Sequence, residues 1–223
     1  MKMSTHRPIL STNEFYHIFN RTIADQPIFD NINNLKKIIR IVYYYRYKQK
    51  VKLSKFYSLP NRIKNEHTEE AHEKLPLVEI YSFAFMPNHY HFLLKQLQDK
   101  GIARFISDVQ NSFAKNFNIV NDRNGSLFQS GFKSRRIAYE EDFYHISRYI
   151  HLNPVTSNII KFNELLDYPY TSLSMYSNTN LNKFINVEYL FNHFRNLSSY
   201  VKFLENQVEY QQKLKRIKDL LLD

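Results

Sequence analysis

The stretch Leu77-Val-Glu-Ile-Tyr-Ser-Phe-Ala-Phe-Met-Pro-Asn-His-Tyr-His-Phe-Leu-Leu-Lys-Gln96 contains two apolar runs separated by Pro87-Asn88. Aromatic and branched runs on either side of turn-forming residues predict two strands joined by a tight turn. Side chains of a strand alternate between faces, so His89 and His91 project the same way, roughly 7 Å apart. The pair follows the turn, at the rim of the expected sheet. Both imidazoles are therefore placed to reach one divalent ion or one phosphate, although two unrelated histidines would give the same pattern.

The rest of the chain supplies the other elements of the predicted fold. A segment of charged, weakly periodic sequence from Lys50 to Pro76 reads as an insertion. Turn residues, caps and apolar spacing predict the following order: strand 15–22, helix from Asp30 or Asn31 to about 48, strands 77–86 and 89–96, helix 101–118, strand 127–138, helix 140–152 stopped by Asn153-Pro154, and C-terminal helices from about Val187.

This order predicts an α/β (α+β) fold of the ferredoxin-like type, an antiparallel sheet with helices on one face. The strand that carries His89 would lie centrally in such a sheet. We expect one domain over 1–180, with its insertion at about 50–76, and a helical extension over 181–223. The extra helix over 140–152 and those of the extension add to the basic pattern.

The composition indicates a polyanionic partner. The 223 residues carry a formal net charge of +10, spread along the chain, which favours nucleic acid over an anionic membrane surface. Seventeen tyrosines and eighteen phenylalanines offer stacking platforms for bases or core residues. The absence of cysteine excludes disulfides and thiolate metal sites, so any metal is expected to be Mg²⁺ or Mn²⁺. Without an apolar run of about 20 residues or a signal peptide, we expect a soluble cytoplasmic protein.

A second motif, Arg148-Tyr-Ile-His-Leu-Asn-Pro-Val155, follows the expected sheet. On a helix, Tyr149 and Asn153 are four residues apart and share one face. A phenol and a carboxamide so placed are able to act on one centre. The alternative is a helix end, with Asn153 as the C-cap and Pro154 ending the helix.

Three motifs in this order resemble those of the single-tyrosine HUH transposases, in particular the REP-associated tyrosine transposase branch. They are Met86-Pro-Asn-His-Tyr-His91, Gly125-Ser-Leu-Phe-Gln-Ser-Gly-Phe-Lys133 and Tyr149-Ile-His-Leu-Asn-Pro-Val155. The similarity covers roughly residues 10 to 175. It implies that His89, His91 and Asn153 bind Mg²⁺ or Mn²⁺ and that Tyr149 is the nucleophile.

The resemblance also implies an activity and a partner. The expected reaction is cleavage and rejoining of single-stranded DNA, guided by a DNA hairpin and passing through a 5′-phosphotyrosine. We expect a monomer or homodimer. His145 and His151 lie near Tyr149 in the sequence, either as proton acceptors or as surface histidines.

Further residues are candidates for DNA contact. Lys133, Arg135 and Arg136 lie where the resemblance places a DNA-contacting strand, and guanidinium groups suit phosphate recognition. Asn20 and Arg21 also match the family's pattern.

The run Tyr43-Tyr-Tyr-Arg-Tyr47 is suited either to stack on bases or to pack one side of a helix. The insertion has no counterpart in the smallest family members, and it would read a hairpin, hold a partner or cover the core.

Two other functions compete with a strand transferase. One is a domesticated protein that binds hairpin DNA or structured RNA without cutting it. A pure binder has no need of a nucleophile, so the joint presence of His89, His91, Tyr149 and Asn153 argues against it. The other is a replication-initiator or relaxase-type HUH nuclease, which usually orders the motifs differently or carries paired tyrosines.

Overall fold

The computed structural model describes residues 9–177 and 184–208. The expectations for residues beyond 208 lie outside the described residues. Short 3₁₀ helices occur at Ile23–Asp25 (η1), Phe162–Asp167 (η2) and Ser172–Met175 (η3). The main elements are β1 (Phe15–Arg21), α1 (Ile32–Tyr45), α2 (Leu53–Tyr57), α3 (Asn61–His72), β2 (Val78–Met86), β3 (His89–Gln96), α4 (Gly101–Val120), β4 (Lys133–Ile137), α5 (Glu140–Thr156), α6 (Glu188–Phe194) and α7 (Leu197–Glu205).

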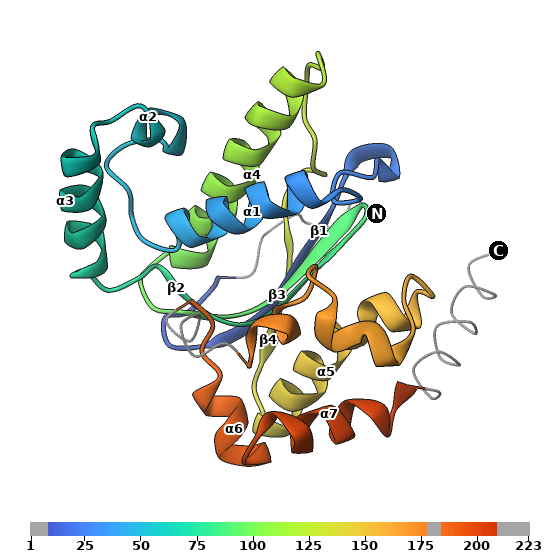
Figure 1. Cartoon of the computed structure of the whole chain (residues 1–223). Helices are drawn as coiled ribbons and strands as arrows, with labels where there is room; N and C mark the ends of the chain where they lie inside the picture. The colour runs from blue at the N-terminus through green and yellow to red at the C-terminus, as the bar shows by residue number, and fades with distance from the viewer. Residues whose placement is uncertain (1–8, 178–183, 209–223) are drawn as a thin grey trace, which may run out of the picture.

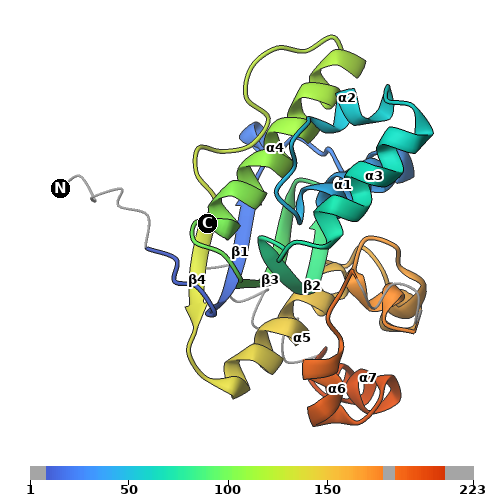
Figure 2. The ribbon, with the colours of Figure 1, turned by 90° about the vertical axis from the view of Figure 1, so that its left-hand side faces the viewer.

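The four strands form one antiparallel sheet in the order β2-β3-β1-β4. This is the ferredoxin-like arrangement predicted from the sequence, and it places β3 with its two histidines between β2 and β1. Figure 2 shows β4 and β2 at the two edges of the sheet.

Helices cover both faces of the sheet. The face that carries Ile18, Phe92 and Phe85 joins the main core with α1 and α4. The other face carries Leu93 and packs against Phe143 and Ile150 of α5. Figure 1 shows α1 and α4 on one side of the sheet and α5 on the other, with α6 and α7 beside α5. The histidine face is thus covered by the helix that carries Tyr149.

Two predicted boundaries differ from the structure. Helix α5 continues through Pro154 to Thr156, so the predicted stop at Asn153-Pro154 and a C-cap role for Asn153 are wrong. Burial of Val155 in the core offsets the backbone hydrogen bond that proline cannot make. The predicted strand 127–138 is regular only over β4, because Gly131 interrupts it with a φ of 77°.

The insertion and the C-terminal segment both pack onto the sheet domain. Residues 50–76 form α2 and α3, which lie against α1 (Figure 1). In the extension, Leu190 and Tyr200 belong to the same core cluster as the sheet. Within the described ranges, no helix is long and apolar enough to cross a membrane.

Candidate functional site

His89 begins β3 at the rim of the sheet, and its neighbours fix its tautomer. The Asn88 amide nitrogen donates to a carboxylate oxygen of Asp25 at 3.1 Å, so the amide oxygen is left as an acceptor. That oxygen lies 2.7 Å from Nδ1 of His89. Nδ1 must then carry the proton, because an oxygen acceptor requires a donor. In neutral His89, the lone pair is therefore on Nε2.

His91 lies on the same face, one step further into the sheet. Its ring is 5.1 Å from that of His89, centroid to centroid. Burial, then the neighbouring His17, His89 and Arg21, lower the pKa of His91 well below its usual value. The ring is neutral at physiological pH, and its Nε2 is buried without a hydrogen-bond partner among the described residues.

His17 of β1 is a member of this cluster that the sequence analysis missed. Its Nε2 lies 2.9 Å from Nδ1 of His91, so the two rings share a hydrogen bond. Burial, helped by the charge of Arg135, lowers the pKa of His17 to about 4. In β1 the alternation of faces puts His17, Phe19 and Arg21 together. The sequence therefore indicates which residues of β1 share a face with His17. It does not indicate that Phe19 pairs with His91, and this pairing is what brings His17 to the site.

Tyr149 of α5 covers the imidazoles of His91 and His17. Its ring stands edge-on to His91 at 5.5 Å and to His17 at 5.9 Å, centroid to centroid. The side chain is 42% exposed, so it contacts both the histidines and solvent. Helical spacing puts Asn153 one turn further along. Asn153 is buried, and its Nδ2 has no hydrogen-bond partner among the described residues.

The donor set suits a divalent ion with nitrogen, amide and water ligands. The described ranges contain no group of three His, Cys, Asp or Glu side chains placed to hold a metal. A site here would therefore consist of His89, His91, the Asn153 amide and water. The neutral ring of His91, with its unpartnered buried Nε2, fits that description, and His89 supplies a second imidazole on the same face. The unpartnered atom of Asn153 is the donor Nδ2, so a cation would bind to its Oδ1 instead.

The other two histidines of α5 are occupied elsewhere. His145 is exposed, and its Nδ1 accepts a hydrogen bond from Arg148 at 2.8 Å. His151 is fully buried rather than at the surface, with Tyr200 Oη and Ser172 Oγ each 2.8 Å from one of its nitrogens. Both ring nitrogens of His151 are thus engaged away from Tyr149.

Strand alternation divides the three cations of β4. Lys133 and Arg135 pair with Phe19 and His17, so they share the histidine face. Arg136 faces the other way, and its guanidinium makes two hydrogen bonds to Glu14 at 2.8 and 2.9 Å. Lys133 and Arg135 are exposed beside the site, whereas Arg136 is held in an ion pair.

The two candidates at the end of β1 also differ. Arg21 is opposite His89 in the register and exposed at the rim, within 3.3 Å of Asp25. Asn20 is buried on the other face, donating to the Gln129 carbonyl and accepting from the Arg21 amide. Asn20 therefore orders the chain at the rim and is not directed outward.

Comparisons with known proteins bear on the fold. No family model and no curated protein matches the sequence. The structure of a REP-associated tyrosine transposase bound to a REP hairpin is similar, with a TM-score of 0.54 at 15% identity, covering 80% of this chain and 88% of that chain. A protein of Deinococcus radiodurans R1 assigned as a transposase gives a TM-score of 0.36 at 14% identity, covering 66% and 95%, and supports no argument. The chain therefore has the fold of the first of these proteins.

Proposed function

We propose that the protein is a metal-dependent single-stranded DNA endonuclease and strand transferase, a transposase of the REP-associated tyrosine type. One observation carries the proposal. The half-exposed phenol of Tyr149 lies against His91, whose Nε2 is buried and has no partner among the described residues. The fold likeness to a protein bound to a REP hairpin supports hairpin DNA as the substrate class.

Tyr149 is the proposed nucleophile. Its phenolic oxygen attacks the phosphorus of a backbone phosphodiester and loses its proton, while the bond from phosphorus to the 3′ oxygen breaks. The products are a 5′-phosphotyrosine and a 3′-hydroxyl, which takes up a proton. A 3′-hydroxyl of another strand end reverses these steps, and the retained ester bond makes ATP unnecessary.

His89, His91 and Asn153 would hold Mg²⁺ or Mn²⁺. When bound, the ion polarises the phosphate and neutralises charge that develops on its oxygens. Burial favours the neutral ring of His91, and its hydrogen bond with His17 allows the tautomer whose Nε2 carries the lone pair. At His89, the Asn88 amide oxygen fixes the proton on Nδ1. Lys133, Arg135 and Arg21 would bind flanking phosphates at the rim.

The test is a denaturing gel of the full chain incubated with labelled DNA hairpins that carry single-stranded flanks, in Mg²⁺ or Mn²⁺. We expect a covalent protein–DNA adduct that Tyr149→Phe abolishes, with hairpin affinity nearly unchanged, since only the attacking oxygen is lost. Tyr139→Phe is the matched control, because Tyr139 precedes the same helix and is 74% exposed. An undiminished adduct in Tyr149→Phe would exclude Tyr149 as the nucleophile. Tight hairpin binding without any adduct from the wild type would instead support the non-cutting binder.

A further inference from the structure

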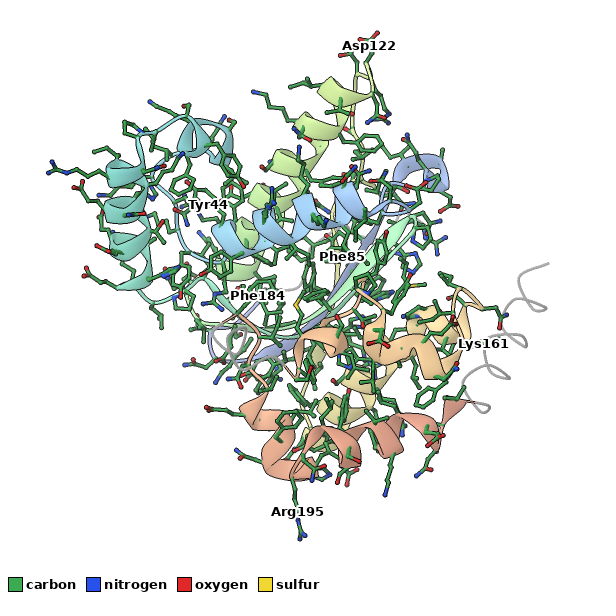
Figure 3. The ribbon with its side chains drawn as sticks, in the orientation of Figure 1. Tyr44, Phe85, Asp122, Lys161, Phe184 and Arg195 are labelled. Carbon is green, nitrogen blue, oxygen red and sulfur yellow. The ribbon has the colours of Figure 1, made fainter. Side chains whose placement is uncertain are left out.

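A pocket of about 350 Å³ lies between α1, α2 and α3, away from His89 and His91. Its wall is mostly aromatic, from Tyr43, Tyr44, Phe56, Tyr57 and Phe184. Figure 3 places Tyr44 between α1 and the α2–α3 segment, with Phe184 below it. The volume falls within the range of roughly 300–1,000 Å³ that is typical of small-ligand sites. We call this cavity the aromatic pocket.

Two residues that line the aromatic pocket have buried polar atoms without partners among the described residues. Both ring nitrogens of His67 are in this state, and so is Oε1 of Gln49. The amide nitrogen of Gln49 donates to the Tyr44 carbonyl, so Oε1 remains an acceptor. A neutral imidazole adds one donor and one acceptor. These three atoms lie just beneath the apolar surface of the pocket, so a small rotation of His67 or Gln49 would bring a donor or an acceptor to the edge of a planar heterocycle, whereas an aliphatic or phenyl group would leave all three unsatisfied.

The ring geometry suits a flat ligand. Tyr44 and His67 are nearly parallel, with an interplanar angle of 16° and centroids 6.4 Å apart. Tyr43 and Tyr57 are 43% and 52% exposed, so the pocket offers tyrosine rings to solvent as well as to its interior. Aromatic side chains arranged in this way stack on nucleobases regardless of sequence.

The surrounding charge suits a polyanion. Residues 46–65 contain seven lysines and arginines and no aspartate or glutamate. Lys48, Lys52 and Lys55 are exposed, and no ion pair engages them within the described ranges. On α3, Glu66 and Glu70 are paired with basic residues and, in the described part of the chain, Glu69 is not. Residues 46–74, with eight lysines and arginines and four glutamates, still keep a net positive charge. Phosphates on either side of a bound base would meet net positive charge.

We infer that the aromatic pocket binds one unpaired nucleobase of a DNA strand. The inference rests on the proposed function, which supplies the DNA. The pocket is built on α1, on the opposite side of the sheet from α5. The base it takes is therefore not the one beside the phosphate that Tyr149 attacks. Its role is to hold a distant part of the substrate, such as a hairpin loop or flank.

The protein contains no tryptophan, so one introduced indole reports on binding. The Tyr57→Trp variant keeps an aromatic ring at the pocket, and Tyr139→Trp is the matched control at an exposed tyrosine that does not line it. The probe is an eight-nucleotide single strand containing each of the four bases twice. A strand of eight abasic residues keeps the phosphates without bases, and a mixture of the four deoxynucleoside monophosphates supplies free bases. All titrations contain EDTA, so that no cleavage is needed.

We expect the single strand to quench the emission of Tyr57→Trp but not that of Tyr139→Trp, and the abasic strand to quench neither. Adding Thr68→Phe, which fills the cavity, or His67→Phe, which removes the unpartnered nitrogens, should weaken strand binding roughly 5- to 100-fold.

Equal quenching in both reporters, equal quenching by the abasic strand, or unchanged affinity after Thr68→Phe would overturn the inference. Free monophosphates binding as tightly as the strand would also overturn it, in favour of a free-nucleotide site. Base binding without a Tyr149 adduct would refute the proposed function alone, and an adduct without base binding would refute the inference alone.

Discussion

At His89 and His91, the partner of one ring nitrogen decides whether the other nitrogen is able to bind a cation. The Asn88 amide oxygen fixes the proton on Nδ1 of His89. At His91 the shared hydrogen bond with His17 admits two tautomers, and only the one with the proton on Nδ1 leaves Nε2 free. A cation at Nε2 would select that tautomer.

The first prediction concerns the metal ligands. His89→Ala or His91→Ala should remove Mn²⁺ binding, because each deletes an imidazole that water replaces poorly. Asn153→Ala should weaken Mn²⁺ binding less, since water partly substitutes for a neutral amide. Calorimetric titration of the full chain without DNA measures all three affinities. If both histidine variants bind Mn²⁺ as the wild type does, these side chains are not the ligands.

The second prediction concerns His17, which would act through His91 rather than on the ion. His17→Ala removes the acceptor for Nδ1–H of His91, and loss of such a supporting partner typically lowers metal affinity roughly 10- to 100-fold. His17→Gln keeps an oxygen acceptor, so it should recover part of the affinity. The same calorimetric titration provides the readout. Equal losses in both variants would indicate a packing role instead.

At the scale of the element, β4 shows how alternation separates adjacent residues with the same charge. Arg135 faces the histidines, and Arg136 is held by Glu14 on the opposite face. Their sequence alone does not distinguish the two arginines. They form a matched pair for an experiment, since both are exposed and one strand carries them.

The third prediction uses that pair. Arg135→Gln should reduce the dependence of log affinity on log salt by about 0.7 for single-stranded DNA, the value of one phosphate contact. Arg136→Gln should leave the slope nearly unchanged, because its guanidinium is already engaged by a carboxylate. Fluorescence anisotropy of a labelled strand at several salt concentrations measures the slopes. Equal slopes for the two variants would show that strand orientation does not select the DNA-contacting arginine.

At the scale of the whole molecule, one buried hydrogen-bond network joins segments that are distant in the sequence. His151 of α5 lies between Tyr200 of α7 and Ser172, and Ser172 Oγ accepts from the backbone amide of Phe83 in β2. Ser147 adds a further contact to Tyr200. The network anchors the helix that carries Tyr149 to the sheet and to the C-terminal helices.

The fourth prediction follows from the burial of His151, which lowers its pKa to about 3 from 6.5. Above pH 6.5 the side chain is neutral in both the folded and the unfolded state, and the network contributes fully. As the pH falls from 6.5 towards 3, only the unfolded state gains the proton, so the free energy of unfolding decreases. At pH 5 this loss is about 2 kcal/mol.

Urea unfolding in EDTA at pH 7 and pH 5 measures this effect. His151→Gln is the control, because glutamine does not titrate. It should be less stable than the wild type at pH 7, since it disturbs the network, yet lose less stability between the two pH values. The same loss in the variant as in the wild type would assign the acid sensitivity to other groups.

The sequence by itself determined the fold and the candidate residues of the site. Apolar runs, turn residues and strand alternation are local, so they predicted the 77–96 hairpin, the shared face of His89 and His91, and the element order that gives the observed sheet. Helical spacing likewise put Tyr149 and Asn153 one turn apart. Their catalytic and metal-binding roles stay predictions, since a role depends on a ligand as well as on position.

Only the tertiary structure decided which of these residues meet and which are already engaged. It brought His17 to His91, 74 positions away, and Arg136 to Glu14, 122 positions away. It also buried His151 among distant hydroxyl groups and shaped the insertion into a pocket with α1. Such contacts depend on strand register and helix packing, which join segments far apart in the chain, and no local pattern of residues contains that information.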